Sequence, residues 1–328
     1  MTGGAARLAL AILIGATPVF AQTDARQAAP SVADAFITLG TMGGPVPMPA
    51  RSQPANALVH AGHVYLVDAG DGTVQQLARA GIMLPRVKAI FLSHLHADHT
   101  GGLSAILSLR NQTNARDRLT VYGPSGSREL VAGIVASMQP AARVGYGIPG
   151  QPWKPPAETV NVIEIGPDET LSVDGMKISA AQNSHYDFAA GSIEDRNYKS
   201  LSFRFDMPSR SIVYTGDTGP SAAVEKLAIG ADLLVSEMID MGGTMANVAR
   251  NSPDMPPVAK QQLEQHLSTH HLTPDEVGRL ANKAGVKALV ITHFAAGTPD
   301  PVRTQGYVTQ IKTHYRGPVT LANDLDRF

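Results

Sequence analysis

The feature that most restricts the fold is a short apolar run that leads almost directly into a cluster of metal-ligating side chains. Ala89-Ile90-Phe91-Leu92 has the composition of a buried strand. After Ser93 comes His94-Leu95-His96-Ala97-Asp98-His99. Three imidazoles and one carboxylate in one loop are hard to explain by packing, whereas they are ligands that suit Zn, Mn or Fe. In an irregular turn, His94 and His96 point to one side and Asp98 and His99 to the other, so one loop is expected to serve two adjacent metal ions.

The same pattern recurs three times further along the chain. His185 follows the apolar run near Ile178, Asp217 follows Ile212-Val213, and His293 follows Ala288-Leu289-Val290. A single histidine at a strand end is weak evidence for a metal site, since such a residue is more often a packed or surface residue than a ligand. Open α/β folds place active groups at the carboxyl ends of strands, so four such cases together predict one site. The chain contains no Cys, which excludes thiolate ligands.

Apolar strand-like runs alternate with helical segments along the whole chain. Thr273, Pro274 and Glu276 form a capping-box start for the last predicted helix. The alternation predicts an α/β architecture with a central sheet, and no internal repeat is present. Predicted strands contain Val64–Val67, Ala89–Leu92, Leu119–Tyr122, Met176–Ile178, Leu201–Phe205, Ile212–Tyr214, Leu233–Val235 and Ala288–Ile291; predicted helices are Val74–Ala80, Leu103–Leu109, Arg128–Met138, Ala222–Ala228 and Asp275–Ala284.

The N-terminus has the pattern of a secretory signal peptide. Arg7 precedes the apolar run Leu8–Ile14, and Val19 and Ala21 are small residues at the −3 and −1 positions of a cleavage site. The pattern predicts a signal peptide over residues 1–21 and a single hydrolase domain over residues 22–328. A buried N-terminal helix is the alternative. Export to the periplasm or the medium is therefore expected, with no membrane anchor.

The run His94–His99 resembles the metal-binding signature of the metallo-β-lactamase superfamily. His185, Asp217 and His293 match its later ligand motifs. Within the superfamily the chain is most similar to the ribonuclease Z and arylsulfatase branch. The residues that carry this finer match are Leu39-Gly40-Thr41, Val67–Thr73, Val121–Pro124 and His271-Leu272-Thr273, the last beginning 22 residues before His293.

The resemblance implies a four-layer αβ/βα sandwich of the metallo-β-lactamase type with two divalent metal ions, most often Zn²⁺, with Mn or Fe as alternatives. One ion would be held by His94, His96 and His185, and the other by Asp98, His99 and His293, with Asp217 bridging both. Asp98 would also hold the nucleophilic water. His271 would be the general acid, and a surface histidine near a helix start is the alternative. Asp68 and Glu237 lie at strand ends and are expected either to orient ligand imidazoles or to have a purely structural role.

The substrate is expected to be a small ester, such as an aryl sulfate, a phosphodiester or a phosphotriester. Ribonuclease Z enzymes have a long tRNA-binding arm between the third ligand histidine and the bridging aspartate, and here only 31 residues separate His185 from Asp217. The net charge of −1 also gives no basic footprint for RNA. We therefore expect no nucleic-acid partner and disfavour tRNA 3′ processing. A lactonase or β-lactamase, a non-catalytic metal-binding protein and a homodimer stay open as alternatives.

Overall fold

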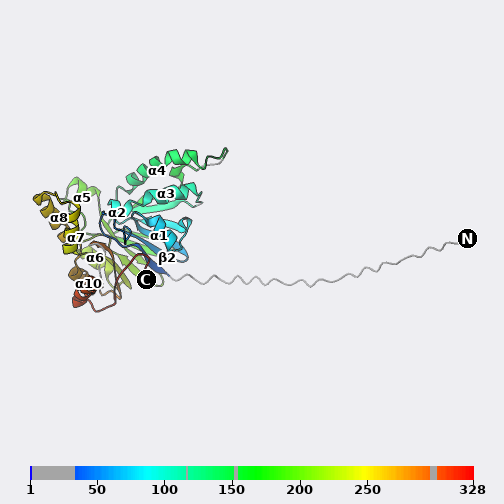
Figure 1. Cartoon of the computed structure of the whole chain (residues 1–328). Coiled ribbons are helices and arrows are strands. Elements are labelled where there is room, and N and C mark those ends of the chain that lie inside the picture. Colours follow the sequence, from blue (N-terminus) through cyan, green and yellow to red (C-terminus); the bar gives the residue numbers. More distant parts are fainter. Residues whose placement is uncertain (2–33, 116, 151–153, 296–300) are drawn as a thin grey trace. The chain divides into compact units, whose positions relative to one another are not determined.

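Two mixed β-sheets form the centre of the computed structural model, which describes Met1 and residues 34–115, 117–150, 154–295 and 301–328 (Figure 1). The first sheet has the order β1-β2-β3-β4-β5-β6 and the second the order β13-β12-β11-β10-β9-β8-β7. The strands of the first sheet are β1 (Ala35–Gly40), β2 (Ala55–His60), β3 (His63–Ala69), β4 (Val87–Phe91), β5 (Leu119–Gly123) and β6 (Val160–Glu164). Those of the second are β7 (Thr170–Val173), β8 (Met176–Gln182), β9 (Leu201–Asp206), β10 (Ser211–Tyr214), β11 (Leu233–Ile239), β12 (Leu289–Ala295) and β13 (Val319–Leu321).

Helices cover the outer face of each sheet. The α-helices are α1 (Thr73–Arg79), α2 (Ala97–Thr100), α3 (Leu103–Gln112), α4 (Ser127–Val144), α5 (Ile193–Asn197), α6 (Ala222–Ala228), α7 (Met241–Asn251), α8 (Pro257–His270), α9 (Pro274–Ala284) and α10 (Pro301–His314). Two 3₁₀ turns, η1 (Leu84–Arg86) and η2 (Pro156–Glu158), complete the described elements. One apolar cluster joins the first sheet to α1, α3 and α4, and another joins the second sheet to α6, α9 and α10.

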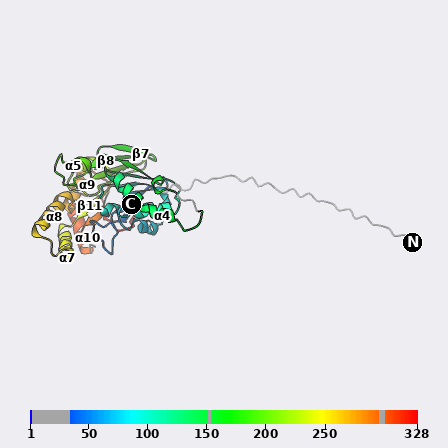
Figure 2. The same cartoon turned by 90° about the horizontal axis from the view of Figure 1, so that it is seen from above.

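A third apolar cluster lies between the two sheets and joins them. Phe91 of the first sheet meets Phe203 and Phe205 of the second edge to face, with ring centroids 6.0 and 5.4 Å apart. These rings are fully buried, and burial of such side chains is the main source of folding free energy. Helix, sheet, sheet and helix are thus four layers, which confirms the predicted αβ/βα sandwich (Figure 1); Figure 2 shows the same elements from above.

The strand directions bring the ends of both sheets to one edge. β3 to β6 run parallel to one another, as do β10 to β13. At this edge the Leu201 N–H donates to the Ser93 carbonyl at 2.9 Å, and the Phe294 N–H donates to the Thr41 carbonyl at 2.8 Å. Loops that leave the carboxyl ends of these strands therefore converge, which is where open α/β folds build their sites.

All eight predicted strand cores lie in or overlap observed strands, and all five predicted helices are present. The capping box is confirmed, because the Thr273 side chain accepts from the Glu276 N–H and the Glu276 carboxylate accepts from the Thr273 N–H. Residues 2–21 of the predicted signal peptide lie outside the described residues. Residues Val32–Phe328 form one compact unit, and the predicted boundary at residue 22 stays a prediction. No helix in the described part of the chain is both long and apolar enough to cross a bilayer.

Candidate metal centre

The loop between β4 and α3 carries its four polar side chains into two separate groups. His96 is the N-cap of the short helix α2, and Asp98 and His99 lie inside that helix. This change from extended to helical backbone turns His94 and His96 toward one group and Asp98 and His99 toward the next. The fold brings all seven predicted ligand residues together at the sheet edge.

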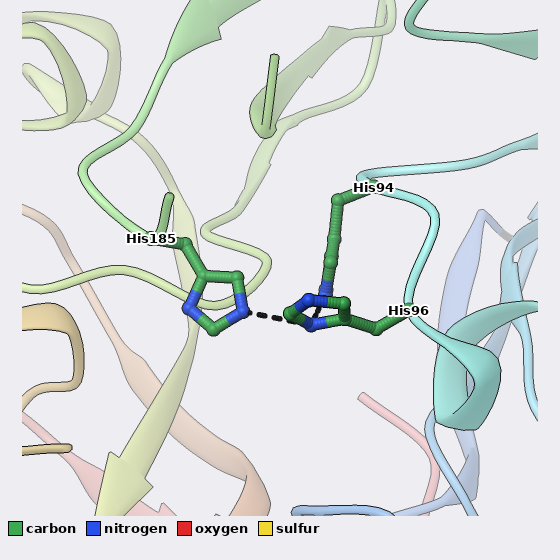
Figure 3. A group of neighbouring side chains, drawn as sticks. All are labelled: His94, His96 and His185. Atoms are coloured by element: carbon green, nitrogen blue, oxygen red, sulfur yellow. Dashed lines mark hydrogen bonds between the residues drawn. The ribbon is translucent and has the colours of Figure 1, made fainter. Parts of the chain in front are cut away.

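The first group contains His94, His96 and His185 (Figure 3). The Nδ1 atom of His96 lies 3.1 Å from Nε2 of His94 and 3.0 Å from Nε2 of His185. Two nitrogens bound to one tetrahedral zinc ion at about 2.0–2.1 Å lie about 3.3 Å apart. The observed spacing therefore fits a shared cation, and three nitrogen lone pairs at this distance repel one another without a proton or an ion between them.

The second group contains Asp98, His99 and His293. Nε2 of His99 and Nε2 of His293 each lie 3.8 Å from the Asp98 carboxylate. His293 has φ of 41°, a left-handed conformation that costs a residue with a side chain about 1 kcal/mol. Such local strain is characteristic of residues that the surrounding fold aims into a site.

Asp217 lies between the two groups. Its Oδ1 atom is 3.2 Å from Nε2 of His99, and its Oδ2 atom is 3.2 Å from Nε2 of His293. Oδ2 also lies 3.9 Å from Nε2 of His94 and 3.7 Å from Nε2 of His185. One buried carboxylate therefore reaches both groups, which is the placement that a bridging ligand requires.

Several buried atoms in the site have no hydrogen-bond partner among the described residues. They include Nε2 of His99, Oδ1 of Asp217 and Nε2 of His293. A buried polar atom without a partner costs about 1–3 kcal/mol, so a cluster of them needs a ligand. These atoms face one another and combine imidazole nitrogen with carboxylate oxygen, so the residues fit divalent metal ions.

The protonation states of the first group also fit metal binding. Burial lowers the pKa of His185 to about 3, and burial followed by repulsion from His99 keeps the pKa of His94 well below its usual range. Both rings are therefore neutral near pH 7, and a neutral imidazole is the form that binds a metal. Burial opposes ionisation of Asp217, but His293 and His99 hold the pKa of its carboxyl well below the usual value.

Asp68, at the end of β3, orients His99 from behind. Its Oδ2 atom accepts hydrogen bonds from Nδ1 of His99, the Tyr214 hydroxyl and the Ser93 hydroxyl, each at 2.8 Å, and Oδ1 accepts from the Ser93 N–H at 2.7 Å. The bond to Nδ1 fixes the proton on that nitrogen and turns the Nε2 lone pair toward Asp217. The sequence left open whether Asp68 orients a ligand; in the structure it contacts one directly.

His271 lies beside the centre and is paired with Glu237. Its Nδ1 atom is 2.7 Å from the Glu237 carboxylate, and both side chains are buried. Burial lowers the pKa of His271, but Glu237 outweighs this and raises the pKa to about 9. The ring lies 5.0 Å from that of His185 and stacks on that of His293 at 6.2 Å, centroid to centroid. His271 is thus a protonated, oriented ring at the edge of the centre, not a surface histidine.

Two further histidines near the centre had no part in the prediction. The ring centroid of His266 lies 6.0 Å from that of His185. Nδ1 of His270 forms a hydrogen bond with the Ser184 carbonyl. Both lie on α8, a helix with no buried residue, so no apolar periodicity marks it in the sequence. The sequence signal for these two histidines was their spacing of four residues, which places them on one face of a helix.

Taken together, the fold and the donor set define a metal-dependent hydrolase. The family described as "Beta-lactamase superfamily domain" matches residues 63–294, and the chain belongs to this family, in its metallo-β-lactamase form. Ribonuclease Z of Mycolicibacterium paratuberculosis is 31% identical over 300 residues, covering 89% of this chain and 96% of the relative. Ribonuclease Z of Mycobacterium sp. (strain KMS) is 29% identical over 293 residues, covering 89% of this chain and 94% of the relative.

Solved structures agree on the fold. The metallo-β-lactamase fold protein YhfI from Bacillus subtilis aligns with a TM-score of 0.63 at 19% identity, covering 90% of this chain and 99% of YhfI. The short form of human tRNase Z aligns with a TM-score of 0.61 at 22% identity, covering 90% of this chain and 98% of the human protein.

These relatives correct two expectations from the sequence. The expected small-ester substrate, with no nucleic-acid partner, is wrong, because the relatives that match nearly the whole chain are ribonucleases. The physical reason is that net charge averages over the whole surface and does not report the charge around one site. The expected periplasmic or secreted location is likewise wrong by this comparison, because the relatives that match nearly the whole chain are named ribonuclease Z.

Proposed function

We propose that this chain is a metal-dependent phosphodiesterase that cleaves RNA, and that it acts as a tRNA 3′-processing endonuclease. The observation that carries the proposal is the similarity to ribonuclease Z relatives over 89% of this chain and up to 96% of theirs. The similar region includes every residue of the metal centre, so the chemistry and the substrate class are inferred together.

In this proposal two divalent ions of the zinc class bind at the two groups. His94, His96 and His185 would hold one ion, Asp98, His99 and His293 would hold the other, and Asp217 lies within reach of both groups. When bound, such a pair of ions lowers the pKa of water toward neutrality and neutralises negative charge on the reacting phosphate. The orphaned nitrogens of His99 and His293 support this assignment.

The protein's own side chains handle the protons. Asp98 is buried between His99 and His293, and its carboxylate accepts the proton of the attacking water. His271 donates a proton to the leaving oxygen from Nε2, since its Nδ1 is bonded to Glu237. Glu237 keeps His271 protonated and correctly turned. General acid catalysis of this kind contributes about 10²–10⁴-fold to the rate.

RNA binding does not require the arm that the sequence lacks. Between β11 and His271 the chain inserts α7 and α8, which lie side by side in both views (Figures 1 and 2). α8 ends at His270, which is bonded to the loop that carries His185. In the proposal this helical pair borders the path of the RNA and takes over part of the arm's role.

The test is cleavage of a precursor tRNA with a 3′ trailer by the purified, zinc-loaded chain. We expect release of the trailer by the wild type, no cleavage by Asp217→Asn, and a loss of about 10²–10⁴-fold for His271→Ala. Glu158→Gln is the matched control and is expected to cleave at the wild-type rate, because Glu158 is exposed and precedes β6, at the end of the sheet away from the metal centre.

Bis(p-nitrophenyl) phosphate, measured in parallel, separates the two parts of the proposal. Turnover of this diester without cleavage of RNA contradicts the substrate and leaves the phosphodiesterase chemistry standing. Metal binding without turnover of either substrate contradicts both and favours a protein that only binds metal.

A further inference from the structure

A third group of metal-ligating side chains lies outside the two groups of the centre. It contains Asp187, on the loop after β8, and His266 and His270, on α8; one ligand atom from each lies within 4.8 Å of the others. The proposed reaction uses none of these residues. They are also distinct in sequence from the seven residues of the centre.

The two histidines are arranged as a pair on one helix face. They are four residues apart on α8, so their side chains project from the same face, one turn apart. Their rings are nearly parallel, with an interplanar angle of 29° and centroids 4.9 Å apart. Two histidines at this spacing on a helix are a recurrent way to hold one zinc ion.

The hydrogen bond of His270 determines which nitrogen is available. Its Nδ1 atom is bonded to the Ser184 carbonyl, which only accepts, so Nδ1 carries the proton. Metal-binding histidines characteristically donate their other N–H to a carbonyl or carboxylate in this way. In the neutral ring the Nε2 lone pair then faces Oδ1 of Asp187 at 3.5 Å. A lone pair facing a carboxylate is repelled by it unless a proton or a metal ion lies between them.

We propose that His266, His270 and Asp187 bind a third divalent cation of the zinc class. The set offers two imidazole nitrogens and one carboxylate oxygen, a combination that suits zinc. Asp187 has 72% of its side chain exposed, so the site opens to solvent and a water molecule completes the coordination. Three protein ligands with one open position are weaker than a closed four-ligand site, so this ion is exchangeable.

The location gives the ion a structural consequence. Asp187 is two residues after His185, and His270 immediately precedes His271. The cation therefore ties the loop that carries a ligand of the centre to the helix that leads to the proposed general acid. It also draws His266 away from His185 and His271, with which His266 otherwise forms an alternative ligand group.

The test is metal stoichiometry, which does not depend on the proposed RNA substrate. Purified full-length wild type, Asp187→Asn and His266→Gln are dialysed to equilibrium against the same free zinc concentration, and the zinc bound per chain is obtained by subtracting the zinc of the dialysate. We expect each variant to bind one zinc ion fewer than the wild type. Glu264→Gln, an exposed acidic residue on the same helix, is the matched control and is expected to bind the wild-type amount.

Three results overturn the proposal. Equal zinc content in all four proteins means that no ion is bound at these residues. Loss of one ion in His266→Gln but not in Asp187→Asn assigns the ion to the group formed by His185, His266 and His271. Loss in Glu264→Gln as well means that zinc binds the surface of α8 nonspecifically. Circular dichroism of each variant verifies that the fold is retained.

Discussion

Removing the Asp68 carboxylate tests whether this side chain orients the proposed metal ligand His99. In the structure this buried side chain accepts four hydrogen bonds, at 2.7 to 2.8 Å, from Ser93, His99 and Tyr214. In Asp68→Ala the hydroxyls of Ser93 and Tyr214 can rotate to other acceptors. The Ser93 N–H and the His99 Nδ1–H cannot, and each orphaned donor costs about 1–3 kcal/mol.

The expected loss in the free energy of unfolding is therefore about 2–6 kcal/mol for Asp68→Ala. Asp68 has φ of 60°, and an alanine in this left-handed conformation adds about 1–2 kcal/mol. Asp68→Asn keeps the shape and tolerates the same backbone, so it should lose less. The neutral amide of Asp68→Asn no longer holds His99 with a charge. The affinity of this variant for metal should therefore still fall about 10–100-fold.

Urea unfolding followed by circular dichroism measures the stability change, with chelator present so that metal loss does not contribute. Metal affinity is measured separately by competition with a chromophoric chelator. Tyr214→Phe is the control, since it removes one donor and orphans none of the other three. A stability loss under about 1 kcal/mol for Asp68→Ala, the size of a typical single hydrogen bond, refutes the reasoning.

The remaining predictions concern protons, packing and metal. Glu237→Gln removes the charge that raises the pKa of His271 to about 9. Since the general acid acts only when protonated, the alkaline limb of the pH profile of kcat/KM should move to lower pH. An unchanged alkaline limb contradicts the proposed role of the His271–Glu237 pair. In Gly70→Ala the new Cβ would lie 2.2 Å from the Asp98 carbonyl oxygen, so the metal loop must shift and metal affinity should fall, by titration, at least about tenfold. Gly133→Ala has open space around the new Cβ and should be neutral or stabilising, by up to about 1 kcal/mol. Chelation should lower the melting temperature reversibly, because an ion bound only to the folded state stabilises it; an unchanged melting temperature in calorimetry argues against the centre.

The part of the fold that positions the site was predictable because its signal is local. Runs such as Ile212–Tyr214 are apolar, β-branched and short, and each ends at a residue with metal-binding chemistry. Strands such as β2 were missed because Asn56 and His60 interrupt the apolar pattern, although both are buried in the structure. Tertiary context gives the amide nitrogen of Asn56 a partner, since it donates to the Val67 carbonyl at 3.2 Å.

The helical pair α7 and α8 was not predictable from periodicity. α8 has no buried residue, so its sequence lacks the apolar residues that repeat with the helical period in a packed helix. The expectation of a small-ester substrate rested on the short interval between His185 and Asp217, whereas the helices α7 and α8 lie after β11. Insertions on one fold are free to occur in different loops, so an empty interval excludes little.

The pairing of two sheets across one centre has a consequence for the order of synthesis. His94, His96, Asp98 and His99 follow β4, whereas His185, Asp217 and His293 belong to the second sheet. A chain emerging from the ribosome presents the first four donors long before His293 is translated. An ion at Asp98, His99 and His293 could not be fully enclosed until β12 has left the exit tunnel and docked, so loading of that position is a late event in the synthesis of the chain.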